Sequence, residues 1–334
     1  KSIAINGYYT ADRYRGAIGS YLQNMQNPEL KWEQKMDYNI GLDAVFMGVD
    51  IRMDFYKSIT KDLVSSVGIA PSTGFTTVSE NLGKVENKGF EILASYTPWQ
   101  SRDGFVRING SIAYNKDKIL KISDAMRQFN ENQAALAAME DQALPVAQYQ
   151  DGLSMNTIFA VPSLGIDPAI GLEMYRKQDG SSTYIWRDTD RVPCGVSVPL
   201  YRGTVGITGE YKGIGISITG RYLGGGQMYN STLVNMVENA DISQNFDRRV
   251  LTERWNHVGH HAFFKRYKSN TPYDLRNGIY WYSKDGWRQP PTQSTSRFVQ
   301  DQKEFDISSI SVYYDFKREW IAKIGFERLR LTAL

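Results

Sequence analysis

The sequence is poor in the features that define several protein classes. It has one cysteine, Cys194, so it contains no intrachain disulfide framework. No stretch approaches the roughly 20 consecutive apolar residues of a membrane helix, and hydrophobic residues make up 41% of the chain. The net charge is only +3, and no Lys/Arg-rich run indicates a nucleic-acid interface. We therefore expect no nucleic-acid partner and no helical membrane span.

Groupings of catalytic and metal-binding residues are also missing. No Ser-His-Asp or Cys-His grouping occurs, and no helix start follows the glycines 224–226 at the spacing that a phosphate loop requires. Asp188 and Asp190 lack the glycine and the final glutamate of a calcium loop. The histidines lie in a glycine-containing loop without a carboxylate at helical spacing: His257, His260 and His261. We expect neither an enzyme nor a bound metal or cofactor.

The pattern that is present is a strict alternation of apolar and polar residues. It runs through 36–47 and, after a turn at Gly48, resumes over 49–56. Because a strand sends successive side chains to opposite faces, each such segment has one apolar and one polar face. The polar face carries full charges, which a packed soluble core would accept only at high cost. A β-barrel with lipid outside and water inside accommodates both faces.

Eight segments show this alternation clearly, and a weaker one lies at Ile3–Tyr9. The clear segments are 36–47, 49–56, 90–96, 106–114, 205–211, 214–222, 310–316 and 329–332. Segments of roughly ten residues suffice for a tilted strand to cross the hydrocarbon layer. We therefore predict an all-β protein, a transmembrane antiparallel β-barrel in a bacterial outer membrane.

The connections between these segments alternate in length. Short turns are expected near Gly48, at 98–104, at Lys212-Gly213 and at 317–319, and long loops at about 60–87, 117–203 and 225–304. Outer-membrane barrels have short periplasmic turns and long extracellular loops. A soluble sandwich has no reason to sort its loops in this way, so the alternation predicts the topology as well as the fold.

Specific residues follow from this topology. The charged residues that we expect to face the lumen are Asp50, Arg52, Asp54, Arg221, Arg328 and Arg330. Aromatic residues lie near the short turns, and we expect them to form a girdle at the periplasmic surface of the membrane. They are Tyr96, Trp99, Tyr314 and Trp320.

The long loops contain two further features. Ser123 or Asp124 can cap a helix over Ala125–Leu144, which ends at Pro145. The third loop is dense in aromatic residues, which suit stacking on sugars or contact with peptides, although a loop of this size also needs a small core of its own. Our candidates for ligand contact are Trp255, Trp281, Tyr282 and Trp287.

Ten short blocks of sequence follow one another in a recognisable order: 27–33, 60–64, 71–75, 83–91, 114–120, 165–168, 210–213, 254–255, 296–299 and 328–331. Through these blocks, nearly the whole chain resembles the C-terminal half of the SusC-like TonB-dependent transporters. Physical roles fit some blocks: Pro28 fixes an extended strand entry, Asp167-Pro168 starts a turn, and Asn87-Lys88 lies at headgroup depth. The chain departs from the family at Ile170, where members commonly carry threonine.

The resemblance implies a part of a roughly 22-stranded barrel, with residues 1–334 as its C-terminal portion. Without an initiator methionine, Lys1 is expected to be an internal start, and the plug domain, the segment that TonB grips and the closing strand are expected outside this chain. By resemblance, the whole protein imports glycans or oligopeptides, is energised through TonB, and works with a SusD-like lipoprotein that closes over the extracellular loops, where it would meet the candidate contact residues.

One alternative stays open at this point. Eight strands can also close a small barrel, and a β-rich carbohydrate-binding module would use exposed aromatic residues without any transport activity. Either alternative needs protein to cover the outward apolar faces and leaves the sorting of loop lengths unexplained.

Overall fold

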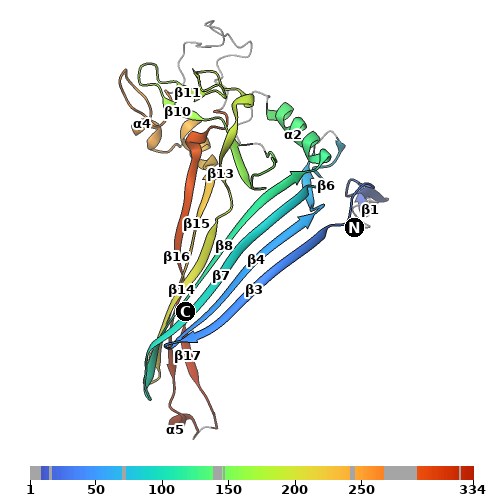
Figure 1. Cartoon of the computed structure of the whole chain (residues 1–334). Helices are drawn as coiled ribbons and strands as arrows, with labels where there is room; N and C mark the ends of the chain where they lie inside the picture. The colour runs from blue at the N-terminus through green and yellow to red at the C-terminus, as the bar shows by residue number, and fades with distance from the viewer. Residues whose placement is uncertain are drawn as a thin grey trace.

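A computed structural model describes residues 9–14, 17–69, 73–137, 145, 147–240, 245–266, 292–322 and 325–334. Its main feature is a long, curved antiparallel sheet with the strand order β17-β16-β15-β14-β8-β7-β4-β3 (Figure 1). The bounds are β3 Gln34–Phe46, β4 Val49–Lys61, β7 Gly83–Gln100, β8 Gly104–Ile122, β14 Tyr201–Tyr211, β15 Ile214–Tyr229, β16 Val299–Asp315 and β17 Arg330–Ala333. All eight predicted segments are confirmed as strands of this one sheet.

The sheet is open within the described residues. β3 and β17 form its two edges, so it does not close into the small barrel that we considered from the sequence. A weak strand was expected at Ile3–Tyr9, and all of it except Tyr9 lies outside the described residues. A separate hairpin follows there, formed by β1 (Tyr9–Tyr14) and β2 (Ala17–Leu22).

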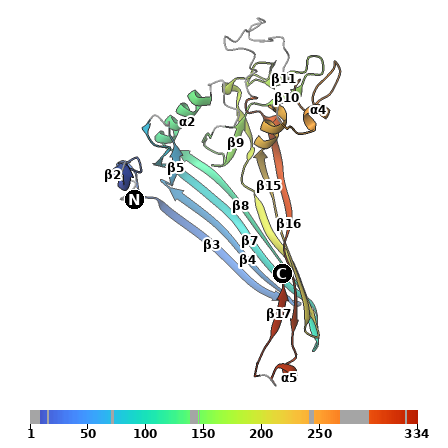
Figure 2. The same ribbon diagram turned by 180° about the vertical axis from the view of Figure 1, so that it is seen from behind.

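The short connections lie at one end of the sheet, and the long loops lie at the other (Figures 1 and 2). Met47 and Gly48 join β3 to β4 with φ values of 50° and 77°, and Lys212 and Gly213 join β14 to β15 with 52° and 88°. Two successive residues of positive φ form the turn whose twist matches that of the flanking strands. The predicted turns at Gly48 and Lys212-Gly213 are therefore confirmed. The turn predicted at 98–104 is confirmed as well, since β7 ends at Gln100 and β8 begins at Gly104.

The last connection at the short-turn end is longer than predicted. β16 ends at Asp315 and β17 begins at Arg330, so residues 316–329 replace the expected turn at 317–319. This segment contains the short helix α5 (Arg318–Ile321), whose Ile321 is buried. A helical turn that buries its own apolar residue has no alternating pattern, which is why the sequence did not indicate it.

The loop end carries small elements of its own. The first long loop contains the hairpin of β5 (Val64–Gly68) and β6 (Thr77–Asn81). The second contains α2 Asp124–Ala137, β9 Thr157–Ala160, β10 Ser163–Ile166, β11 Glu173–Arg176, β12 Ser182–Thr183, η2 Asp188–Asp190 and β13 Val192–Val196. The third contains α3 Ser231–Leu233, the π-helical turn η3 Val234–Glu238, α4 Arg249–Thr252 and η5 Ser296–Phe298.

The predicted helix in the second loop is confirmed in its described part. α2 begins at Asp124, and the hydroxyl of Ser123 accepts a hydrogen bond from the amide of Met126 at 3.2 Å. This is the geometry of a serine N-cap. Residues 138–144, where the sequence predicted the rest of the helix, lie outside the described residues. Among the helices that the structure describes, none is long and apolar enough to cross a membrane.

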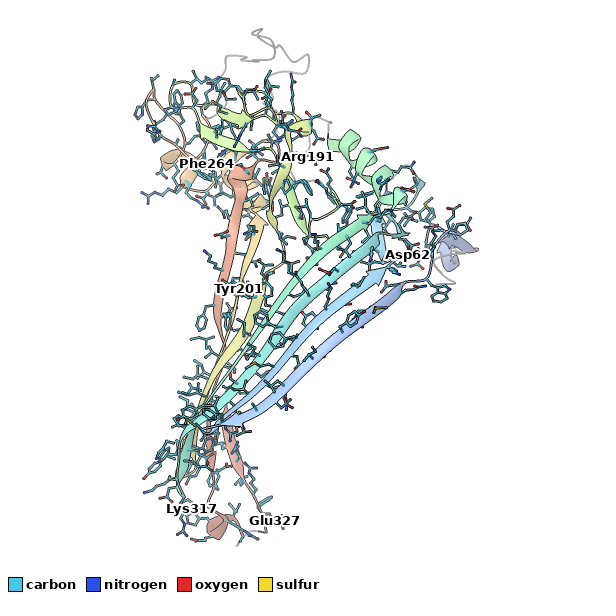
Figure 3. The ribbon with its side chains drawn as sticks, viewed as in Figure 1. Asp62, Arg191, Tyr201, Phe264, Lys317 and Glu327 are labelled. Carbon is cyan, nitrogen blue, oxygen red and sulfur yellow. The ribbon has the colours of Figure 1, made fainter. Side chains whose placement is uncertain are left out.

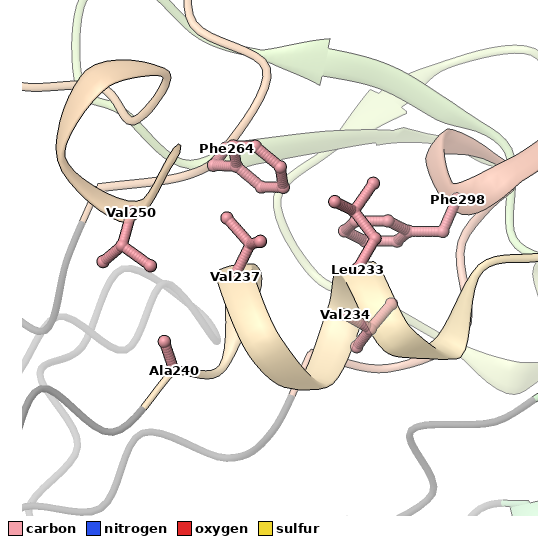
Figure 4. Packing of buried hydrophobic residues seen from close by; sticks show 7 residues of the cluster. All are labelled: Leu233, Val234, Val237, Ala240, Val250, Phe264 and Phe298. Carbon is pink, nitrogen blue, oxygen red and sulfur yellow. The ribbon is translucent and has the colours of Figure 1, made fainter. Parts of the chain in front are cut away.

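The third loop has the small core that its size required. This cluster consists of Leu233, Val234, Val237, Ala240, Val250, Phe264 and Phe298 (Figure 4). Phe264 and Phe298 are 1% and 0% exposed, so two of the aromatic residues serve packing. A second cluster of Val67, Leu82 and Met126 packs α2 against the first loop.

Candidate functional site: the charged sheet face and the loop cluster

The register of the sheet separates an apolar face from a charged face over all eight strands. One row of directly opposed residues on the apolar face is Ile40, Phe55, Phe90, Tyr114 and Tyr201. Ile40 is 74% exposed and Phe55 49%. Single exposed apolar residues are ordinary on a soluble protein, but a contiguous exposed apolar surface is not. Aromatic rings continue the row, with centroid distances of 6.2 Å for Phe55–Phe90 and 5.4 Å for Phe90–Tyr114. This face needs an apolar environment around it.

The opposite face gathers the charged residues that the sequence singled out on β4. Arg52 donates to Asp43 at 3.0 Å, and Asp50 accepts a hydrogen bond from the hydroxyl of Ser95 at 3.4 Å. Asp54 stands beside Gly41 and Glu91 in the register. Asp50 and Arg52 are exposed and Asp54 is half-buried, so an ion pair such as Arg52–Asp43 contributes little to stability. The arrangement is a polar wall with no catalytic grouping.

Two arginines near the other edge belong to the same wall. Arg221 of β15 pairs with Asp306 of β16 at 3.0 Å, and the two residues are directly opposed. Arg330 of β17 pairs with Asp315 of β16, which it opposes in the register. Arg328 precedes β17 and reaches the same Asp315 at 3.4 Å. All six residues that we expected to face the lumen thus belong to one polar wall, either through an ion pair or hydrogen bond or through their position in the strand register. That this wall lines a lumen stays a prediction.

The aromatic residues near the short turns divide between sheet and connection. Trp99 of β7 packs against Tyr211 of β14 with a ring distance of 6.3 Å. Trp320 lies instead in α5, 54% exposed, with the ammonium group of Lys317 5.6 Å from the centre of its indole ring. Figure 3 shows Lys317 and Glu327 beyond the end of the sheet, opposite Arg191 and Phe264 in the loops.

A buried charge cluster joins the second and third loops. The guanidinium group of Arg297 bonds Glu173 at 2.7 and 3.0 Å and Glu238 at 2.7 Å. These side chains are only 5%, 2% and 0% exposed. A further N–H of Arg297 donates to the carbonyl of Phe263 at 2.6 Å, and its guanidinium carbon lies 4.4 Å from the centre of the Phe298 ring. We call Glu173, Glu238 and Arg297 the arginine clamp.

The electrostatics of the arginine clamp favour its charged state. Burial alone would raise the pKa of Glu173, but the charge and hydrogen bonds of Arg297 outweigh it and hold that pKa below its usual value. Burial likewise disfavours charged Arg297, and the two carboxylates overcome this and raise its pKa. Burial lowers the pKa of Lys265 nearby, against the attraction of Glu238 and Glu173. The sequence block at 296–299 contained Arg297, yet nothing local indicated its partners.

The structure describes one of the four aromatic candidates for ligand contact. The indole N–H of Trp255 donates to the carbonyl of Pro168 at 2.8 Å, and its ring lies against the backbone of Gly171. Gly171 has a φ of 70°, so the turn that follows Asp167-Pro168 leaves room for this ring. Trp255 therefore fastens the third loop to the second. Trp281, Tyr282 and Trp287 lie outside the described residues.

The turn at Asp167-Pro168 is confirmed in detail. Asp167 accepts hydrogen bonds from the amide of Ala169 at 2.8 Å and from the hydroxyl of Tyr184 at 2.5 Å. Both hydrogen bonds lower the pKa of the Asp167 carboxyl, and the bond from Tyr184 has the larger effect. A side chain that bonds the backbone two residues on is the usual turn-forming contact of aspartate.

The weak candidates for metal binding have other roles among the described residues. Asp188 pairs with Arg191 at 2.5 Å, and Asp190 accepts from the amide of Gln178 at 3.2 Å. The rings of His257 and His260 stack at 5.1 Å. In the part of the chain that the structure describes, no three histidine, cysteine, aspartate or glutamate side chains group as metal ligands would. That the protein binds no metal stays a prediction.

The sequence and the fold both have known relatives. Residues 4–156 match the model of a family described as TonB dependent receptor-like, beta-barrel. TonB-dependent receptor P3 of Formosa agariphila is 23% identical over 332 residues, which cover 94% of this chain and 30% of that protein. TonB-dependent receptor SusC of Bacteroides thetaiotaomicron is 33% identical over 100 residues, 29% of this chain and 10% of that one.

A solved structure shares the fold over the full length of the chain. The structure of the RagAB peptide transporter superposes with a TM-score of 0.71 and 18% identity, covering 99% of this chain and 35% of that one. The chain thus spans about a third or less of the length of these relatives. The sequence matches confirm the resemblance found in the blocks, and the superposition confirms the fold. Over residues 4–156 the chain therefore resembles the β-barrel of the TonB-dependent receptors, which are proteins of the bacterial outer membrane, and over nearly its full length it has the fold of the RagAB peptide transporter.

Proposed function

We propose that this chain forms part of the wall of an active importer, as the C-terminal portion of a larger barrel. Its apolar face meets lipid, and its charged face lines a water-filled passage. The observation that carries the proposal is the separation of the two faces across eight strands, with all long loops at one end. A sheet that only covered a soluble core would not expose both a charged and an aromatic face.

The energy source and the partner are part of this proposal, and both are inferred from the resemblance to the SusC-like TonB-dependent transporters. TonB would act through a plug region in the remainder of the transporter, and a SusD-like lipoprotein would close over the long loops. The arginine clamp and Trp255 support this role because they fasten the second and third loops into one platform. A rigid platform suits a partner that docks repeatedly, since it loses little conformational freedom on binding.

For the substrate we propose glycans or oligopeptides. Ion pairs such as Arg221–Asp306 and Arg52–Asp43 give the wall both positive and negative charges. Such a wall suits polar cargo and does not retain cargo of one charge preferentially. Of the aromatic candidates, Trp281, Tyr282 and Trp287 remain the contacts that we propose for ligand or lid. Trp255, in the same long loop, fastens that loop to the second one. Uptake of labelled oligopeptides and oligosaccharides by cells carrying the transporter distinguishes the two cargo classes.

Cysteine labelling in intact outer membranes tests the orientation of the wall. Single cysteines replace Ile51, Arg52, Asp54 or Phe55 in a Cys194→Ser background. We expect a water-soluble maleimide to label the Arg52 and Asp54 positions, and a lipid-soluble maleimide alone to label the Ile51 and Phe55 positions. The reverse pattern would refute the proposed wall, and labelling of all four positions by the water-soluble reagent would show that no lipid covers the apolar face.

A further inference from the structure

A row of lysines interrupts the apolar face near the long loops. Lys57 of β4 stands directly opposite Lys88 of β7, which stands directly opposite Lys116 of β8. One step further toward the loops, Lys118 of β8 opposes Glu86 of β7. We call Lys57, Lys88, Lys116 and Lys118 the lysine row. All four residues are exposed.

The lysine row begins where the aromatic part of the apolar face ends. Phe55, Phe90 and Tyr114 each lie two residues from one of the first three lysines on the same strand, on the side away from the long loops, and share their face. Two residues along a strand correspond to about 7 Å. The ammonium groups therefore follow directly on the stacked rings, at the boundary between an apolar band and its polar surroundings.

The opposite face at the same height is covered by protein. Asp117, which lies between Lys116 and Lys118 on β8, accepts hydrogen bonds from the hydroxyl of Ser154 at 2.6 Å and the amide of Met155 at 2.7 Å. Val85 and Ile119 are 1% and 2% exposed. The second loop thus folds over the charged face and leaves the lysine row facing outward.

The lysine row carries an excess of positive charge that the chain only partly offsets. Like charges in directly opposed positions destabilise a sheet, and neighbouring strands are only about 4.8 Å apart. Glu86 bonds Lys57 at 2.8 Å, so one carboxylate faces four ammonium groups and leaves three positive charges. Lysine is a point charge that binds phosphate without demanding a fixed geometry. An anionic group outside the chain would offset this repulsion.

We propose that the lysine row binds the phosphate groups of an anionic lipid in the leaflet next to the long loops. The inference goes beyond import and rests on the proposed orientation, in which the apolar face meets lipid. Lysines on three neighbouring strands span about 10 Å, so a lipid headgroup with two phosphates fits better than one with a single phosphate. The bound lipid would stabilise the wall where β4, β7 and β8 leave the membrane.

Native mass spectrometry of the detergent-purified transporter that contains this chain tests the site. The probes are bisphosphorylated lipid A and the same lipid without its phosphates. We expect the unaltered protein to bind the phosphorylated lipid at least about tenfold more tightly. The variant Lys57→Gln/Lys88→Gln/Lys116→Gln keeps side-chain length, removes three charges, and should lose this preference.

A matched control removes the same number of charges at the other end of the sheet. The variant Arg102→Gln/Lys317→Gln/Arg318→Gln alters the turn after β7 and the connection before β17, and it should bind the phosphorylated lipid as the unaltered protein does. An equal loss in both variants, or equal binding of the two lipids, would overturn the proposal. Competition by inorganic phosphate at the lipid concentration would also overturn it, because free phosphate would then be the ligand.

A second variant protects the test against misfolding. Lys116→Gln/Lys118→Gln leaves the Lys57–Glu86 ion pair in place and should weaken the lipid preference by a smaller factor than the triple change. Lipid binding does not depend on TonB or on cargo. Loss of uptake with lipid binding intact would therefore count against the import proposal alone, and the cysteine labelling reports on the orientation independently.

Discussion

At the scale of single residues, Arg297 has the largest predicted effect on the loops. Its replacement by alanine leaves Glu173 and Glu238 buried without their cation, which costs about 3–5 kcal/mol. We expect faster amide exchange at Val237 and faster proteolysis of the third loop in the purified transporter. Arg221→Ala, which breaks the exposed pair with Asp306, should cost about 0–1 kcal/mol. Equal effects of the two changes would show that the arginine clamp does not hold the loops.

Gly215 offers a second prediction at this scale, because an aromatic ring occupies the space above it. A Cβ at this position would lie 2.0 Å from the ring of Tyr313, whose hydroxyl donates to Glu210 at 2.8 Å. Gly215→Ala should displace that ring and cost about 1–3 kcal/mol of stability. In Gly110→Ala the nearest atom lies 3.7 Å away, so this control should unfold in urea at nearly the original midpoint. A shift of the Gly110 variant as large as that of the Gly215 variant would contradict the packing argument.

At the scale of elements, strands and loops differ in how far the sequence predicts them. Arg221 and Asp306 lie 85 residues apart, yet the two-residue period of β15 and β16 placed Arg221 on the polar face. Arg297 and Glu173 lie 124 residues apart in segments without any period, so their contact depends on how two loops fold over one another. The helix α5 was missed for the same reason. Local alternation predicts a wall, and tertiary packing alone determines the loops above it.

The loop platform should respond to pH through the arginine clamp. The folded-state pKa of Glu173 is lowered, so its contribution to stability is complete above the unfolded value, roughly 4.3, and is lost as the pH falls through the folded value. We expect amide exchange at Val237 to accelerate only in this acidic range. Glu173→Gln should weaken the platform at neutral pH and flatten the acid response. An unchanged acid response in that variant would assign the pH dependence to other groups.

At the scale of the whole molecule, the two edges of the sheet determine what the chain needs from the rest of its protein. β3 presents thirteen residues of edge, Gln34–Phe46, and β17 forms the other edge. Unpaired edges of this length invite pairing with further strands, and a membrane tolerates a sheet only when every backbone group is paired. We therefore expect amides along β3 to exchange at least about tenfold more slowly in the full transporter than in this chain refolded alone in detergent. Amides of the central strand β7 have partners in both preparations and serve as the internal reference. Equal protection of β3 in the two preparations would mean that the chain pairs its own edges, and the wall would then be a closed structure in itself.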